Sequence, residues 1–127
     1  MATQGHPEPS GTAWVSGGYH LPSRLVVHTV GPIVQGRVPG PRDEQALASC
    51  YTSCLDAAEA SGARSIAFCS ISTGLFGYPV ERAAPVALGT VETWLERRRG
   101  EMHVVFNTFS ASDTLVYRKA LAEWSMR

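Results

Sequence analysis

Residues 65–79 read SIAFCSISTGLFGYP, an apolar run that changes at Ser72 into a loop with two glycines three positions apart. The apolar part, Ser65 to Ile71, predicts a buried strand of a parallel sheet, because helices cover both faces of such strands. Pro79 suits the first turn of a helix, which we expect from Val80 to Arg98. The stretch therefore predicts a strand, a glycine-containing loop and a helix N-terminus in succession.

Similar segments lie on both sides of this stretch. Apolar runs predict three more strands, and three- and four-residue apolar spacings predict two more helices. The strands are expected at Thr12–Ser16, Arg24–Val30 and His103–Phe109, and the helices at Asp43–Ser61 and Ala111–Trp124. Strands that alternate with amphipathic helices indicate an α/β fold with a parallel sheet.

Length, charge and hydropathy exclude several classes of protein. The 127 residues suffice for one domain. Eleven basic residues balance eleven acidic ones, which argues against nucleic acid as a partner, because phosphate binding normally requires a basic excess. Arg97, Arg98 and Arg99 fit a helix C-terminus better than a nucleic-acid patch. No apolar run approaches the roughly 20 residues of a membrane span, so no membrane association is expected.

The three cysteines, Cys50, Cys54 and Cys69, are expected to be free thiols in a reducing compartment, which indicates a cytoplasmic location. Cys50 and Cys54 share a helix face, and we interpret them as small buried thiols in preference to metal ligands. His28, inside an apolar strand, is interpreted as a hydrogen-bonded core histidine. The sequence shows no Ser-His-Asp pattern, paired carboxylates or metal-ligand array, so no catalytic residue and no metal ligand is assigned.

The glycine-containing loop carries the chemistry that the sequence predicts. Gly74 and Gly77 let the backbone approach a ligand closely, and consecutive amides in such a turn can bind an anion beside a helix N-terminus. The hydroxyls of Ser72 and Thr73 are expected to add donors. The loop is neither a P-loop nor a dinucleotide-binding fingerprint. From its spacing alone, phosphate binding and a tight turn without a ligand are equally supported.

The strand expected at His103–Phe109 ends at the same edge of the sheet as this loop. The aromatic ring of Phe109 at this edge would stack on a base, and such stacking contributes about 1–3 kcal/mol to binding. A plain core phenylalanine is the alternative, and the sequence leaves both readings open.

Three stretches together resemble the macrodomain family, also called the ADP-ribose-1″-phosphate (Appr-1″-p) processing family. They are Gly17–Pro22 leading to Val27–Pro32, then Ser65–Pro79, then Val104–Phe109. The opening Gln4–Ala13 and the pair Phe68-Cys69 resemble the zinc-containing bacterial and fungal branch, which removes ADP-ribose from proteins. The resemblance implies ADP-ribose binding by this chain, and hydrolysis of ADP-ribose from modified proteins by the complete form.

The resemblance also implies a fold and a set of site residues. The fold would be a three-layer α/β/α macrodomain with a mixed sheet, truncated to about four strands and three helices. Residues 1–127 would form one incomplete domain that begins with an irregular segment, 1–11. The pyrophosphate and distal ribose would be wrapped by Ser72, Thr73, Gly74, Leu75, Phe76, Gly77 and Tyr78. The adenosine half would lie beside Asn107 and Phe109.

Departures from the family pattern limit what can be carried over. The family's Asn-Ala-Ala-Asn strand, its glycine-rich catalytic loop and its Cys and His zinc ligands have no counterpart here. We therefore expect no cofactor in this chain, zinc being possible only in a complete member, and Met1 is expected to be an internal methionine of a longer reading frame. The alternatives to a hydrolase are a non-catalytic reader of ADP-ribosylated proteins and an inactive fragment.

The absent Asn-bearing strand also affects the expected sheet. In the family it lies between the strands that correspond to Arg24–Val30 and Ser65–Ile71. Its removal would leave two rows of unpaired backbone groups. Three arrangements are then possible. The two strands pair directly, the sheet keeps a gap, or a second chain fills that gap.

Overall fold

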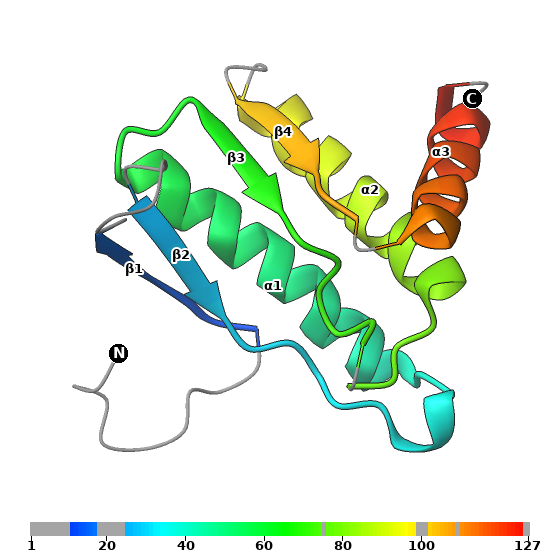
Figure 1. The fold of residues 1–127 in the computed structure, drawn as a ribbon. Helices are drawn as coiled ribbons and strands as arrows, with labels where there is room; N and C mark the ends of the chain where they lie inside the picture. The colour runs from blue at the N-terminus through cyan, green and yellow to red at the C-terminus, as the bar shows by residue number, and fades with distance from the viewer. Residues whose placement is uncertain (1–10, 18–24, 75, 99–101, 109, 126–127) are drawn as a thin grey trace.

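The structure is a computed structural model, and Figure 1 shows its elements in chain order. The described part of the chain contains four strands and three α-helices. The strands are β1 (Ala13–Gly17), β2 (Leu25–Thr29), β3 (Ser65–Phe68) and β4 (His103–Phe106), and the helices are α1 (Pro41–Ala60), α2 (Val80–Arg98) and α3 (Ala111–Ser125), with a short 3-10 turn, η1, at Gln35–Arg37. The described residues are 11–17, 25–74, 76–98, 102–108 and 110–125. The predicted α/β class, with about four strands and three helices, is confirmed.

Most elements lie where the sequence predicts them, and α2 has the predicted bounds. Helix α1 begins at Pro41, two residues before the predicted start, because the Gly40 amide donates to Asp43 Oδ2 at 2.9 Å and closes the first turn. The first ten residues of the predicted irregular segment lie outside the described part.

Two predicted strands are too long. The strand expected to reach Ile71 ends at Phe68, and the one expected to reach Phe109 ends at Phe106. The Asn107 amide donates to the Phe68 carbonyl at 2.7 Å and makes the last bond between them. Beyond that point the Thr73 hydroxyl donates to the Ser70 carbonyl at 3.0 Å, which turns the chain out of the sheet.

The four strands form two separate pairs. Strands β1 and β2 pair antiparallel, with Val15 opposite Val27, and β3 and β4 pair parallel, with Ile66 opposite Val104. Strand β2 is not paired with β3, so the sheet is divided between them. Of the three arrangements considered above, direct pairing of these two strands is therefore excluded.

Aromatic side chains join the helices to one face of β3 and β4. The Tyr51 ring of α1 lies 4.8 Å from that of Phe68, and Tyr117 of α3 lies 5.5 Å from Phe106, centroid to centroid. The alternate residues of both strands face the other way and are exposed, Val105 among them. The described helices therefore bury one face of this strand pair.

Among the described residues, none of the three α-helices combines the length and the hydropathy that a membrane span requires.

His28 is a structural residue, as the sequence indicates. Its ring stacks on Trp14 of the neighbouring strand with centroids 4.8 Å apart. The ring nitrogen Nε2 lies 2.7 Å from the Ser16 hydroxyl. Both contacts join β1 to β2, which accounts for a histidine in an apolar strand.

The three cysteines divide into one exposed and two buried thiols. Cys50 and Cys54 are buried on α1, and Cys69 is exposed just after β3. Burial raises the pKa of Cys54 to about 12 and also raises the pKa of Cys50. The interpretation of Cys50 and Cys54 as small buried thiols is confirmed.

This difference predicts the reactivity of the thiols. At pH 8 a thiol with a pKa near 12 is ionised to roughly one part in ten thousand, and the thiolate is the nucleophile. We expect Ellman's reagent to react rapidly with one thiol, Cys69, and with the other two only after denaturation. A Cys69→Ser variant should lose the rapid phase. Two rapid equivalents in the native wild-type chain would contradict the burial of Cys50 or Cys54.

Candidate functional site

The predicted loop leaves the sheet at the carboxyl end of β3, and Asn107 leaves it at the carboxyl end of β4. The hydrogen bond from Asn107 to Phe68 holds these two ends together, and both chains emerge from the same edge (Figure 1). In α/β folds this edge is where ligands bind. Leu75 and Phe109, also predicted to contact the ligand, lie outside the described residues.

Two residues in the loop have left-handed backbone conformations. Gly77 has φ 84° and Ser72 has φ 67°. For serine this conformation costs on the order of 1–3 kcal/mol, and such strain clusters at functional sites. Two hydrogen bonds close the loop on itself: Tyr78 N donates to the Ser72 carbonyl at 3.0 Å, and Gly77 N donates to the Gly74 carbonyl at 3.1 Å.

These bonds divide the loop amides into two groups. The amides of Gly77 and Tyr78 are engaged inside the loop, and that of Thr73 lies 3.5 Å from the Ser70 carbonyl. Within the described residues the amides of Ser72, Gly74 and Phe76 donate no hydrogen bond. Only part of the amide set expected from the sequence is therefore available to a ligand.

The side chains of the loop differ from the expectation that hydroxyls would face a ligand. The Thr73 hydroxyl lies within 3.0 Å of the Ser70 carbonyl and 2.8 Å of the Ser70 hydroxyl. The Ser72 hydroxyl is buried and has no partner in the described part. Tyr78 is buried, and burial raises the pKa of its phenol, so this side chain anchors the loop. The expectation was wrong because the turn at Ser70 and the conformation of Ser72 direct both hydroxyls inward.

The segment after β2 supports the loop, and this support was not predicted from the sequence. Val34 N donates to the Phe76 carbonyl at 2.7 Å. A Cβ on Gly31 would lie 2.0 Å from Ser72 Oγ, and one on Gly77 would lie 3.0 Å from the Val34 carbonyl oxygen. The Gly31-Pro32 pair, which follows the strand expected at Arg24–Val30 and closes the stretch Val27–Pro32, was the available signal.

At its tip the loop is open. A Cβ on Gly74 would meet no atom within 4 Å, and Phe76 is 36% exposed. The tip of the loop, at Gly74 and Phe76, is therefore accessible to a ligand.

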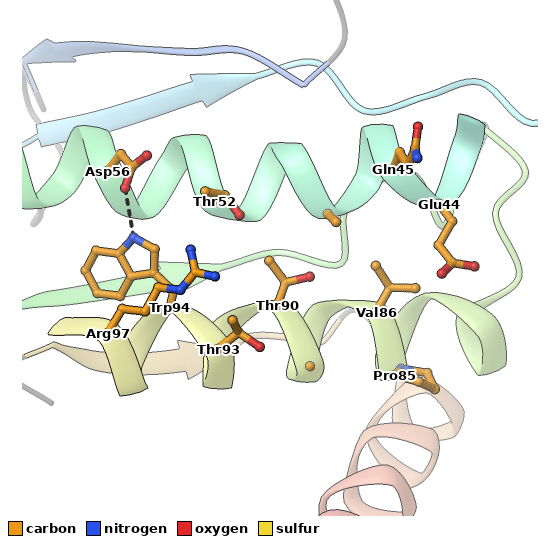
Figure 2. A pocket seen from close by; sticks show the side chains of 12 residues that line it. Glu44, Gln45, Thr52, Asp56, Pro85, Val86, Thr90, Thr93, Trp94 and Arg97 are labelled. Carbon is orange, nitrogen blue, oxygen red and sulfur yellow. Dashed lines mark hydrogen bonds between the residues drawn. The ribbon is translucent and has the colours of Figure 1, made fainter. Parts of the chain in front are cut away.

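Two pockets lie elsewhere in the fold. One, of about 580 Å³, is lined only by α1 and α2, and in it Trp94 Nε1 donates to Asp56 Oδ1 at 2.8 Å (Figure 2). The other, of about 940 Å³, is a groove between β2 and β3. The described residues of the loop line neither of these two pockets.

The described part has no group of three or more His, Cys, Asp or Glu side chains that could hold a metal ion. None of its residues fits the zinc that the resemblance associates with complete members.

Comparison with known proteins identifies the family. The Macro domain family profile matches residues 1–87, and the chain belongs to this family. The chain is 47% identical over 122 residues to a protein-ADP-ribose hydrolase of Treponema medium, covering 96% of this chain and 46% of that protein.

Solved structures give the same result. An Oceanobacillus iheyensis macrodomain with ADP matches with a TM-score of 0.87 and 36% identity, covering 96% of this chain and 63% of that chain. A Trypanosoma brucei macrodomain in complex with ADP-ribose matches with a TM-score of 0.80 and 36% identity, covering 89% of this chain and 46% of that chain. The chain thus spans less than half of the Treponema protein and less than two-thirds of these solved chains.

Proposed function

We propose that this chain binds ADP-ribose and that the loop from Ser72 to Tyr78 holds its diphosphate. The observation that carries the proposal is the set of three amides, at Ser72, Gly74 and Phe76, without hydrogen bonds in the described part. They lie on an open strand-to-helix turn that the left-handed Ser72 shapes. The N-terminus of α2 follows directly and adds a positive dipole end. The family membership and the related macrodomains with ADP and ADP-ribose support the same ligand.

The magnitude of the interaction sets the expected affinity. A hydrogen bond to a charged phosphate oxygen contributes about 1.5–3 kcal/mol, so three amides give roughly 5–9 kcal/mol. Association costs at least about 4 kcal/mol in lost translational and rotational freedom. These bonds alone leave a net of about 1–5 kcal/mol, and a dissociation constant near 1 mM corresponds to about −4 kcal/mol. With the proposed adenosine and ribose contacts added, we expect binding in the millimolar to high micromolar range.

The remaining predicted contacts complete the proposal. Asn107 leaves the sheet at the same edge as the loop, so the adenosine half is assigned to its side. Phe109 and Leu75 keep their proposed ligand contacts on the strength of the resemblance. The distal ribose is assigned to the loop side, next to Gly74 and Phe76.

Catalysis is proposed only for a longer polypeptide. The Treponema relative is a protein-ADP-ribose hydrolase, of which this chain spans 46%. We propose that a complete member hydrolyses ADP-ribose from modified proteins, and that these 127 residues bind ADP-ribose or ADP-ribosylated proteins without hydrolysis. The free cysteines accord with the reducing cytoplasm as the location.

Calorimetric titration tests the binding proposal. ADP-ribose and ADP should both give measurable heat, because both carry the diphosphate, and adenosine should give none at the same concentration. No heat of binding with ADP-ribose at millimolar concentration would refute the proposal. Equal heat from adenosine would show that the loop does not determine the binding. Incubation with an ADP-ribosylated protein should leave the modification in place, and its release would show catalysis by these residues.

A further inference from the structure

The segment between β2 and α1 lies against the candidate site and contains the short turn η1. Just before this turn, Val34 N donates to the Phe76 carbonyl at 2.7 Å. The turn itself is closed by Val38 N, which donates to the Gln35 carbonyl at 3.3 Å. Figure 1 shows η1 beside the loop that leaves β3. A side chain of this turn can therefore contact the loop.

Two successive residues of η1 have left-handed backbone conformations. Gly36 has φ 60° and Arg37 has φ 58°. Glycine adopts this conformation readily, whereas the Cβ of an arginine makes it unfavourable. A residue strained in this way persists only where its surroundings hold it, and such residues cluster at functional sites. The turn therefore sets the direction in which the Arg37 side chain leaves the backbone.

The Arg37 side chain is directed toward the loop. Its Cγ lies 3.9 Å from the position that a Cβ on Gly77 would take. The Gly77 amide donates to the Gly74 carbonyl at 3.1 Å, so the open tip of the loop lies next to this contact. Gly77 also follows Phe76, whose amide donates no hydrogen bond within the described residues. Because Arg37 is exposed, its apolar stem lies against the loop while the guanidinium stays in contact with solvent, within reach of the tip.

The charge of Arg37 has no partner in the described part of the chain. Its guanidinium makes no hydrogen bond or ion pair there. Arg82, in the first turn of α2, differs in this respect, because its Nη2 donates to the Pro39 carbonyl at 3.4 Å. Residues 72–78 include no charged side chain, and backbone amides do not neutralise the negative charge of a diphosphate. Arg37 is therefore a free cation beside an uncharged anion-binding loop.

We propose that Arg37 is a ligand-binding residue whose guanidinium pairs with the diphosphate of ADP-ribose. A guanidinium presents parallel N–H donors that match phosphate oxygens, and such charged hydrogen bonds are stronger than those between neutral groups. The left-handed turn at Gly36 and Arg37 aims this side chain at the loop. The assignment rests on the proposed binding of ADP-ribose by the loop, and it adds a charged side chain from another segment of the chain.

Arg37→Gln tests the assignment, because glutamine keeps part of the stem and removes the charge. Nuclear magnetic resonance titration of the 127-residue chain with ADP-ribose should show a dissociation constant raised roughly three- to tenfold, between the effects of an exposed ion pair and of a charge-assisted hydrogen bond. The affinity for ADP should fall by the same factor, because both ligands carry the diphosphate. A loss confined to ADP-ribose would overturn the assignment, since it would place Arg37 at the distal ribose.

Arg64→Gln is the matched control. Arg64 directly precedes β3, at the edge of the sheet opposite the loop, and its substitution changes the net charge equally. This variant should bind ADP-ribose as the wild type does, and equal losses in both variants would overturn the assignment. Wild-type binding that Arg37→Gln leaves unchanged would overturn the assignment alone. Absence of binding by the wild type would overturn the proposed function and the assignment with it.

The dependence of binding on salt is a second readout. Salt near 1 M shortens the range of charge interactions to about 3 Å, from about 10 Å at 0.1 M. This change should weaken binding by the wild type more than binding by Arg37→Gln, so the ratio of their dissociation constants should approach one. Arg37→Lys, which keeps the charge, should retain part of the wild-type affinity. A ratio that stays constant with salt would overturn the charge pairing.

Arg37→Gly separates binding from stability. Glycine is unstrained at φ 58°, so this variant should unfold at the same temperature as the wild type or at a higher one. It should nevertheless bind ADP-ribose more weakly, by at least the factor measured for Arg37→Gln. Affinity equal to that of the wild type in this variant would overturn the assignment, because the arginine would then be dispensable for the ligand.

Discussion

Replacement of Gly74 by valine is expected to weaken ADP-ribose binding by roughly 10- to 100-fold, which corresponds to the loss of one amide–phosphate bond of about 1.5–3 kcal/mol. A Cβ at this position points into open space, with no atom within 4 Å. The phosphate is proposed to bind in this open space at the tip of the loop. A β-branched side chain would occupy it.

The same geometry predicts that the Gly74→Val chain folds normally. Gly74 is not among the residues with positive φ, so valine meets neither a clash nor backbone strain. The free energy of unfolding should stay within about 0.5 kcal/mol of the wild type, as for an unconstrained surface position. Calorimetry measures the affinity, and urea denaturation followed by tryptophan fluorescence measures the stability.

Gly17→Val is the matched control. A Cβ on Gly17 also meets nothing within 4 Å, and Gly17 pairs with Leu25 at the amino end of β2, away from the loop. This variant should bind ADP-ribose as the wild type does. Unchanged affinity in Gly74→Val would contradict the proposal that the loop amides bind the diphosphate. Equal losses of affinity in both variants would indicate a general perturbation of the fold.

Local pattern was sufficient to predict much of this fold. The apolar spacing and Pro79 predict α2 with its observed bounds, because helix periodicity and start signals are contained in neighbouring residues. The glycine-containing loop was likewise placed correctly after β3. The end of β3 was predicted three residues too late because a turn closed by Ser70 and Thr73 competes with strand propensity.

The state of the candidate site depends on contacts that local pattern does not contain. Whether an amide of the loop is free follows from the left-handed conformation of Ser72, which directs its carbonyl to Tyr78 N. The support of the loop by Gly31 and Val34 joins segments about forty residues apart. Serine gives no sequence signal for positive φ, and a glycine at a strand end does not reveal which side chain packs against it.

Gly31→Ala is expected to reduce both stability and binding. The new Cβ would lie 2.0 Å from Ser72 Oγ and 2.6 Å from Ile71 Cγ2. Overpacking of this kind costs about 1–3 kcal/mol when neighbours can shift, and Ser72 is held by its carbonyl bond to Tyr78. The free energy of unfolding should fall by at least that amount, and ADP-ribose binding should fall with it because Ser72 shapes the loop. Gly17→Ala, which meets no atom, should change neither quantity.

A double-mutant cycle assigns the effect to the contact between Gly31 and Ser72. Ser72→Gly removes a buried hydroxyl that has no partner in the described part and places glycine at φ 67°, where it is unstrained. That variant should be as stable as the wild type or more so. Combined with Gly31→Ala it should recover about 1 kcal/mol or more of the lost stability, because the effects of substitutions at residues in direct contact are not additive. The contact with Ile71 remains, so recovery should be partial, and strictly additive costs would show that Gly31 acts on the loop through some other neighbour.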